Sequence, residues 1–177
     1  KEFLGFEATS FRNTELIYSD EIGSWVADMG FKSVLTEGAK HILGWKSPNY
    51  LYCNSINPRL KVLLSNIVLS DDIAFRFDDE SWNEHPLTAE KFAEWLHTRP
   101  ANEDVINLMF DYETFGVHKK AGSGIFEFLD ALPGEVLKNE GFDVDIFDTT
   151  YYETTDYNDR KKNELFGEFL PADMSKF

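Results

Sequence analysis

Apolar runs and amphipathic stretches alternate along the first part of the chain. Residues 10–17 predict a strand, and a helix follows it because Ser19 can cap the helix and apolar side chains recur at helical spacing over residues 22–29. The apolar run at residues 31–36 predicts a second strand. A strand, a helix and a strand in this order indicate a βαβ unit with parallel strands.

The later pattern continues the same alternation after a long loop predicted at residues 37–58. Apolar runs predict three further strands at residues 60–64, 73–77 and 105–110, of which the last is the most continuous. Two helices are predicted, one capped by Thr88 and one over residues 124–132, where Pro133 ends it, with a further turn at residues 135–139. We therefore expect one α/β domain over residues 1–177, with parallel strands and covering helices.

Charge and cysteine content narrow the classes of partner. Seventeen basic and 32 acidic side chains give a formal net charge of −15, which disfavours nucleic acid and membrane surfaces but not a neutral polysaccharide. Cys53 is the one cysteine, so no internal disulfide forms, and a reducing, cytoplasmic compartment is expected. No set of His, Asp or Glu residues has metal-ligand spacing and no glycine-rich loop follows a strand, so we expect no metal and no cofactor.

Two carboxylates stand out by their places in the pattern. Asp111 ends the most apolar predicted strand, where burial would keep its carboxyl group protonated, although a strand-end Asp is often only a turn or cap residue. Glu15 lies in an otherwise uncharged run and either faces solvent or lines a polar cavity. A glycosidase needs one ionised and one protonated carboxyl group across the scissile bond, and this pair suits the two roles.

Four segments carry a resemblance to a known family. In chain order they are residues 11–18 (FRNTELIY), 36–50 (TEGAKHILGWKSPNY), 69–77 (LSDDIAFRF) and 110–116 (FDYETFG), the last followed by His118. Together they resemble glycoside hydrolase family 57, and within it the small α-amylase branch.

The resemblance implies a fold, a reaction and a set of residues. The fold would be part of a distorted seven-stranded (β/α) TIM-like barrel, and the reaction a retaining cleavage of α-1,4-glucans, with Glu15 as nucleophile and Asp111 as acid/base. In a retaining enzyme the two carboxyl groups lie about 5–5.5 Å apart. The matching segments also imply substrate-binding roles for Arg12, Glu37, His41, Trp45, Asp72, Arg76, Glu113, Phe115 and His118.

Some of these residues have simpler interpretations. His41, Trp45 and Tyr50 can bond sugar hydroxyls and stack on a sugar ring, or instead pack as an aromatic plug beneath the loop. Asp72 and Glu113 are ordinary solvated acids if there is no site. Arg76 lies within a predicted apolar strand, where an unpaired guanidinium is unfavourable, so we expect Asp72 or Glu113 to pair with it.

The chain also departs from the family pattern in three ways. The family opens with a His-Gln-Pro strand and a second motif before the Thr-Glu motif, and no residue upstream of Glu15 matches them. The Trp-rich closing segment is missing, with residues 172–174 at most its beginning. Val117 replaces the acidic residue often found between Gly116 and His118. We therefore expect the chain to be the middle of a longer enzyme.

Three rival functions stay open. A 4-α-glucanotransferase or branching enzyme shares the same covalent intermediate, and a carbohydrate-binding module or inactive fragment would keep the aromatic loop without turnover. A different hydrolytic barrel would be favoured by a metal beside Asp111 and His118. A truncated barrel would leave open sheet edges, which favour homo-oligomers.

Overall fold

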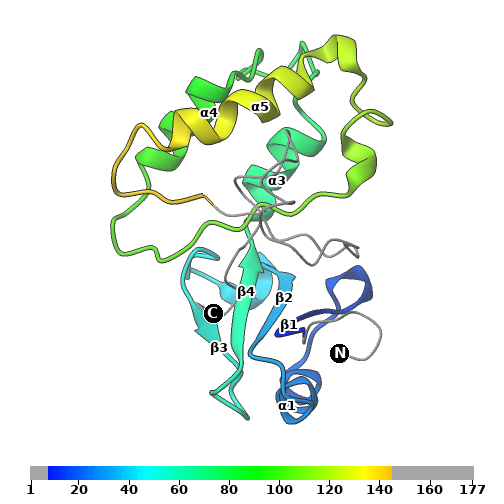
Figure 1. The fold of residues 1–177 in the computed structure, drawn as a ribbon, viewed down its shortest axis with the longest axis vertical. Helices are drawn as coiled ribbons and strands as arrows, with labels where there is room; N and C mark the ends of the chain where they lie inside the picture. Colours follow the sequence, from blue (N-terminus) through cyan, green and yellow to red (C-terminus); the bar gives the residue numbers. More distant parts are fainter. Residues whose placement is uncertain (1–7, 145–177) are drawn as a thin grey trace, which may run out of the picture. The chain divides into compact units, whose positions relative to one another are not determined.

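The computed structural model describes residues 8–144 of the chain (Figure 1). Within them lie two compact units: unit 1 comprises residues 8–37 and 51–64, and unit 2 comprises residues 38–50 and 65–144. The predicted single domain over residues 1–177 stays a prediction. The segment at residues 172–174 lies outside the described residues.

A four-stranded sheet forms the centre of unit 1. Its strand order is β1 (Ser10–Arg12), β2 (Ser33–Glu37), β4 (Lys61–Ser65) and β3 (Tyr52–Cys53). β1 and β2 are parallel, and the Lys61 amide donates to the Lys32 carbonyl at 2.9 Å, which joins the beginnings of β4 and β2 and makes that pair parallel too. β3 is antiparallel to β4. The predicted α/β class is confirmed, whereas the origin of the sheet as part of a distorted seven-stranded TIM-like barrel stays a prediction.

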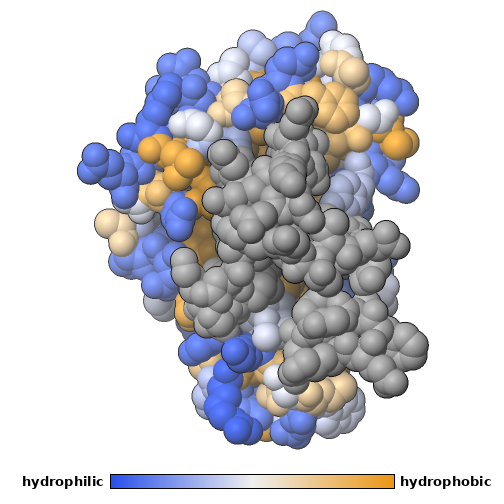
Figure 2. Space-filling view, in the orientation of Figure 1, coloured by the Kyte–Doolittle hydropathy of each residue, from blue (hydrophilic) through white to orange (hydrophobic). Residues whose placement is uncertain are grey.

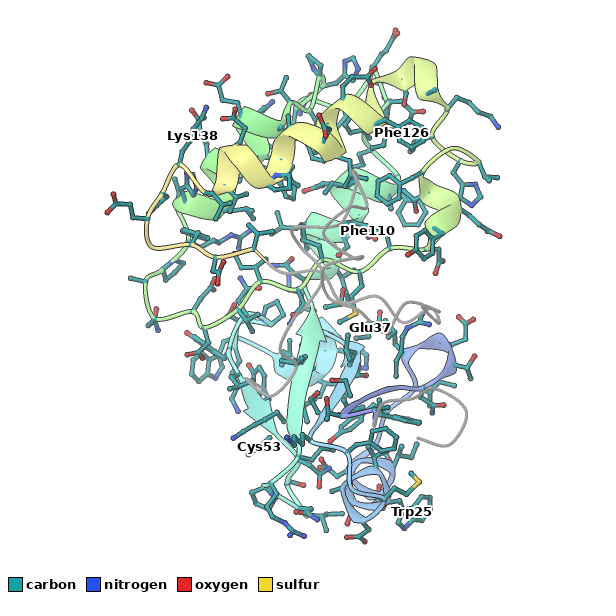
Figure 3. The ribbon with its side chains drawn as sticks, viewed as in Figure 1. Trp25, Glu37, Cys53, Phe110, Phe126 and Lys138 are labelled. Atoms are coloured by element: carbon teal, nitrogen blue, oxygen red, sulfur yellow. The ribbon has the colours of Figure 1, made fainter. Side chains whose placement is uncertain are left out.

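The predicted βαβ unit is confirmed by α1 (Asp20–Asp28), which connects β1 to β2. Ser19 caps it, with its side-chain oxygen accepting from the Ile22 amide at 3.3 Å. The apolar side chains that recur at helical spacing over residues 22–29 are not all buried, because Trp25 is 64% exposed and Met29 is 63% exposed. Figure 3 labels Trp25 on α1. The buried residues of α1 are Gly23 and Val26.

Asn54 holds the beginning of α1 against the connection between β3 and β4. Its side chain is fully buried, and its amide nitrogen donates to the Tyr18 hydroxyl at 2.7 Å and to the Asp20 carbonyl at 2.9 Å. Its amide oxygen accepts from the backbone of Ile56 and Asn57. Close approach here requires Gly23, since a Cβ at that position would lie 2.4 Å from the Asn54 amide nitrogen.

Unit 2 is mainly helical. Its elements are α2 (Lys40–Leu43), α3 (Ile67–Ala74), α4 (Ala89–His97), η2 (Tyr112–Thr114), η3 (Ala121–Ser123) and α5 (Ile125–Val136). α4 and α5 pack side by side in Figure 1, and the Phe92 and Phe128 rings meet edge to face at 5.8 Å between centroids. The cap at Thr88 is confirmed, because its hydroxyl accepts from the Lys91 amide.

The strand predicted at residues 73–77 is wrong. Most of this segment belongs to α3 and the turn after it. Leu69, Ile73 and Phe77 are buried at a spacing of four, which is a helical stripe, while Phe75 is 72% exposed. Asn66 begins the helix by accepting from the Leu69 amide.

The strand predicted at residues 105–110 is also wrong. Only Asn107 pairs, through an isolated parallel bridge to Ser65. β4 ends at Ser65, where the chain turns into α3, so the bridge lies at the last residue of β4. Three apolar residues of the segment, Ile106, Leu108 and Phe110, pack on the helical core instead.

Pro133 does not end the last helix as predicted. α5 continues through Val136, which is 5% exposed in the core. Pro133 lies in the last turns of α5, where its missing N–H removes one hydrogen bond and burial of Val136 offsets that loss. Among residues 8–144, no helix is long and apolar enough to cross a membrane.

Candidate active site

Glu15 lies on a turn and not on the strand predicted over residues 10–17. β1 ends at Arg12, and η1 (Thr14–Leu16) follows at once. Asn13 closes the turn, with its side-chain oxygen accepting from the Thr14 amide at 3.0 Å and its side-chain nitrogen donating to the Ile17 carbonyl at 3.1 Å. The Asn13 side chain therefore competes with further strand pairing.

The backbone at Glu15 is strained. Glu15 has φ 51° and Leu16 has φ 53°, and among residues 8–144 no other non-glycine residue has a positive φ. Each such residue costs about 1–2 kcal/mol relative to an ordinary conformation. The buried Thr36 hydroxyl donates to the Leu16 carbonyl at 2.7 Å and so holds the turn against β2. The result is an exposed carboxylate just beyond the carboxyl end of β1.

Two further predicted residues lie at the same edge of the sheet. Arg12 is the last residue of β1, and Glu37 is the last residue of β2, labelled in Figure 3. β1 and β2 are parallel neighbours with Arg12 opposite Leu35, so their carboxyl ends lie at the same edge of the sheet, where β2 extends two residues further. Both side chains are exposed. Unit 1 therefore brings together Arg12, Glu15 and Glu37, at the strand ends where α/β folds usually place their sites.

Asp111 belongs to unit 2 and begins η2. Its carbonyl accepts from the Thr114 amide at 3.0 Å, but its side chain makes no capping hydrogen bond. The carboxyl group is exposed, so the predicted burial at the end of a strand is wrong, because that strand does not form. The alternative of a turn or cap residue fits its position, since Asp111 is the N-cap residue of η2, although its side chain makes no capping bond. Glu15 and Asp111 lie in different units, and their separation of about 5–5.5 Å stays a prediction.

The segment at residues 111–119, here called the Asp111 loop, carries three more predicted residues. The Glu113 carboxylate lies 3.6 Å from the His118 ring nitrogen, and both side chains are exposed. The Phe115 ring packs edge to face on Phe110 with centroids 5.7 Å apart. Asp111, Glu113, Phe115 and His118 therefore share one loop.

Arg76 has the partner that the sequence predicted. Its guanidinium donates to the Asp72 carboxylate at 2.5 Å, across one turn at the end of α3. Asp72 is buried and Arg76 is part-exposed. The second predicted partner, Glu113, contacts His118 instead. The Arg76 side chain stays 41% exposed in this pair.

The aromatic loop presents its tryptophan to solvent. Trp45 is 89% exposed, so the alternative of a plug beneath the loop is wrong for this ring. His41, on α2, is also exposed, whereas the Tyr50 hydroxyl accepts from Asn102 at 3.3 Å. An open indole face can stack on the apolar face of a sugar.

Sequence reasoning missed Asn49, whose hydrogen bonds connect three segments of unit 2. Asn49 is fully buried; its amide nitrogen donates to the Glu103 carboxylate at 2.5 Å, and its amide oxygen accepts from Asn66 at 3.0 Å. Its backbone carbonyl accepts from the amides of Asp104 and Val105. It therefore links the Trp45 loop to the segment leading to Asp111. Asn49 follows Pro48, a combination that is typical of loops, and nothing in one sequence marks it as buried.

One pocket of unit 2 lies apart from the predicted site residues. It has a volume of about 310 Å³ and lies between the beginnings of α4 and α5, lined by Phe77, His85 and Phe128 among others. None of the predicted site residues lines it.

Residues 1–161 match the family model described as glycosyl hydrolase family 57. The chain belongs to this family. It is 52% identical over 144 residues to a protein of Methanocaldococcus jannaschii described as "Putative alpha-amylase". The match covers 81% of this chain and 30% of that protein, so the chain spans about a third of its relative's length. No solved structure matches the chain. The predicted family is confirmed.

Proposed function

We propose that this chain carries both catalytic carboxyl groups of a retaining glycosidase that acts on α-1,4-glucans, with Glu15 as nucleophile and Asp111 as acid/base. The observation that carries the proposal is the strained turn at Glu15. A non-glycine residue at φ 51° persists only where the surrounding structure holds it, and such strain clusters at functional sites. Here it exposes one carboxylate at the carboxyl edge of the sheet.

The proposed reaction has two displacements. The Glu15 carboxylate attacks the anomeric carbon, the bond from that carbon to the leaving oxygen breaks, and the Asp111 carboxyl group gives its proton to that oxygen. A β-linked glycosyl ester on Glu15 results. Asp111, now ionised, removes a proton from water as the water oxygen attacks the anomeric carbon, which frees Glu15 and yields a product of retained α configuration.

Substrate contacts would come from side chains that the structure leaves open. Trp45 would stack on a glucosyl ring, while Arg12, Glu37, His41 and His118 would bond its hydroxyl groups. Asp72 would orient Arg76, and Glu113 would orient His118. The packing of the Phe115 ring on Phe110 would hold the Asp111 loop in place. The relative's description as an alpha-amylase supports hydrolysis as the outcome, in a barrel that a longer chain would complete.

The experiment is chemical rescue by azide, which separates the two roles by the configuration of the product. Glu15→Gly with azide and α-glucosyl fluoride should yield β-glucosyl azide, since azide attacks in place of the missing carboxylate. Asp111→Ala should yield α-glucosyl azide, since azide attacks the glycosyl ester. The matched controls are Glu21→Ala and Asp130→Ala, at exposed helical acids, which should behave as the unchanged chain. The proposal fails if neither site variant forms a glucosyl azide.

A carbohydrate-binding module without turnover is the second candidate. The 89% exposure of Trp45 favours it, because a stacking platform binds a sugar without help from either carboxylate. Under this function, maltoheptaose would quench tryptophan fluorescence equally in the unchanged chain, in Glu15→Gly and in Asp111→Ala. Trp45→Ala would abolish the quenching, and no azide product would form.

A further inference from the structure

Lys119, at the end of the Asp111 loop, is a buried charge that the proposed reaction does not use. Its side chain is 10% exposed, and its ammonium group pairs with Asp78 and donates to the Phe75 carbonyl at 3.2 Å. A buried ammonium group is unfavourable by several kcal/mol unless it is paired and hydrogen-bonded. Both conditions are met here, so the ammonium position is fixed.

The partners of Lys119 lie at one place on α3. Phe75 is the C-cap residue of that helix, and its carbonyl is among those that the helix leaves without an internal partner. A cation at a helix C-terminus also interacts favourably with the helix dipole. Asp78 follows within one turn. Lys119 therefore fastens one end of the Asp111 loop to the end of α3.

Backbone hydrogen bonds connect the fixed Lys119 to Asp111 across the loop. The Lys119 amide donates to the Thr114 carbonyl at 3.0 Å, and the Thr114 amide donates to the Asp111 carbonyl at 3.0 Å. Thr114 is 4% exposed, and the Gly116 amide closes the turn on the Lys119 carbonyl at 2.8 Å. The Asp111 side chain has no capping bond of its own, so the loop backbone, which sets the direction of its Cα–Cβ bond, is what positions it.

We propose that Lys119 is a positioning residue, which holds the Asp111 carboxyl group in the orientation needed for proton transfer by fastening the loop to α3. The proposal rests on the proposed function, because it assumes that Asp111 is the acid/base. A displacement of about 1 Å at a catalytic group can lower a rate about 100-fold, so a loop anchor of this kind affects turnover more than substrate binding.

The test compares two substrates that differ in their need for an acid. Maltoheptaose has a poor leaving group and needs proton transfer, whereas α-glucosyl fluoride in the presence of azide needs neither the acid nor the base. Lys119→Met removes the charge and keeps the length of the side chain. We expect its kcat on maltoheptaose to fall about 10- to 100-fold with little change in KM, and its turnover of fluoride with azide to stay within about threefold of the unchanged chain.

Two further variants sharpen the comparison. Asp78→Asn removes one partner and leaves the Phe75 carbonyl, so it should show the same pattern to a smaller degree. Lys120→Met, at the exposed neighbouring lysine, should match the unchanged chain on both substrates. Equal losses of Lys119→Met on both substrates would overturn the proposal, since they would mean a general loss of folded protein. So would behaviour identical to that of Lys120→Met.

The variant Asp111→Ala separates this inference from the proposed function. If Asp111→Ala does not lose maltoheptaose turnover selectively, the assignment of Asp111 fails, and the positioning role fails with it. If it does and Lys119→Met does not, only the positioning role fails.

Hydrogen exchange decides the anchor without turnover. In Lys119→Met the amides of Thr114 and His118 should exchange about tenfold faster than in Lys120→Met, with α4 and α5 unchanged. Equal exchange in the two variants would overturn the anchor.

Discussion

Replacing Asn49 by alanine should destabilise unit 2 strongly, because this side chain joins three of its segments. The change removes the oxygen that accepts from the side-chain amide nitrogen of Asn66, and Asn66 is 4% exposed. An unpaired buried donor costs about 1–3 kcal/mol. The Glu103 carboxylate loses a 2.5 Å bond but keeps the Ser47 hydroxyl at 2.6 Å and is only half-buried, so about 1 kcal/mol applies there. The expected loss is about 2–4 kcal/mol.

Urea unfolding, followed by tryptophan fluorescence and by circular dichroism, measures this loss. Asn102→Ala is the matched control: it is exposed and makes one side-chain bond, to the Tyr50 hydroxyl, so it should lose less than about 0.5 kcal/mol. The coupling between Asn49→Ala and Glu103→Gln in a double-mutant cycle should be at least about 0.5 kcal/mol. A loss for Asn49→Ala below about 1 kcal/mol, or equal to that of the control, would refute the reasoning.

Three further predictions concern Glu15, the core and Asp20. Glu15→Gly should leave the free energy of unfolding unchanged or raise it by up to about 1 kcal/mol, because glycine relieves the positive φ. Glu21→Gly, within α1, should lower it by about 1 kcal/mol, and urea midpoints measure both changes. Phe92→Ala, at a fully buried ring, should cost about 3–5 kcal/mol in the same assay, and a loss under about 1 kcal/mol would mean that the core is not packed as described. The Ser55 side-chain hydrogen bond lowers the pKa of Asp20 below its usual value of 3.8, so its stabilising effect is present above that pH and is lost as the pH falls through the lower folded-state pKa. Melting temperatures should therefore favour the unchanged chain over Asp20→Asn near neutral pH and converge in acid, and a constant difference across the range would exclude this linkage.

Local signals in the sequence predicted the part of the fold that depends on local physics. Ser19 and Thr88 were recognised as caps because a side-chain oxygen at a helix start has one obvious use, and the βαβ order required parallel strands. The strand prediction for residues 73–77 was wrong because their apolar side chains also alternate with period two. Only the burial of Leu69 together with Ile73 indicates a helix.

The remaining misses depend on contacts distant in sequence. The run at residues 105–110 is apolar enough for a strand, but a strand also needs a neighbouring strand that runs alongside it, and the one bridge of this run falls on Ser65, the last residue of β4. The turn at Glu15 depends on the Thr36 hydroxyl, which lies 21 residues further along the chain. Asn49 and Lys119 were missed for the same reason, since burial of a polar residue is decided by the segments that pack around it.

The measurement that tests the central claim most directly is mass spectrometry after incubation with 5-fluoro-α-glucosyl fluoride. This reagent forms the glycosyl ester rapidly and slows its hydrolysis, so the covalent intermediate accumulates. The intact chain should gain the mass of one fluoroglucosyl group, and peptide mapping should locate it on Glu15, with no adduct on Glu15→Gly. An adduct on another carboxylate, or none while maltoheptaose still quenches tryptophan fluorescence, would contradict the assignment of Glu15 as the nucleophile.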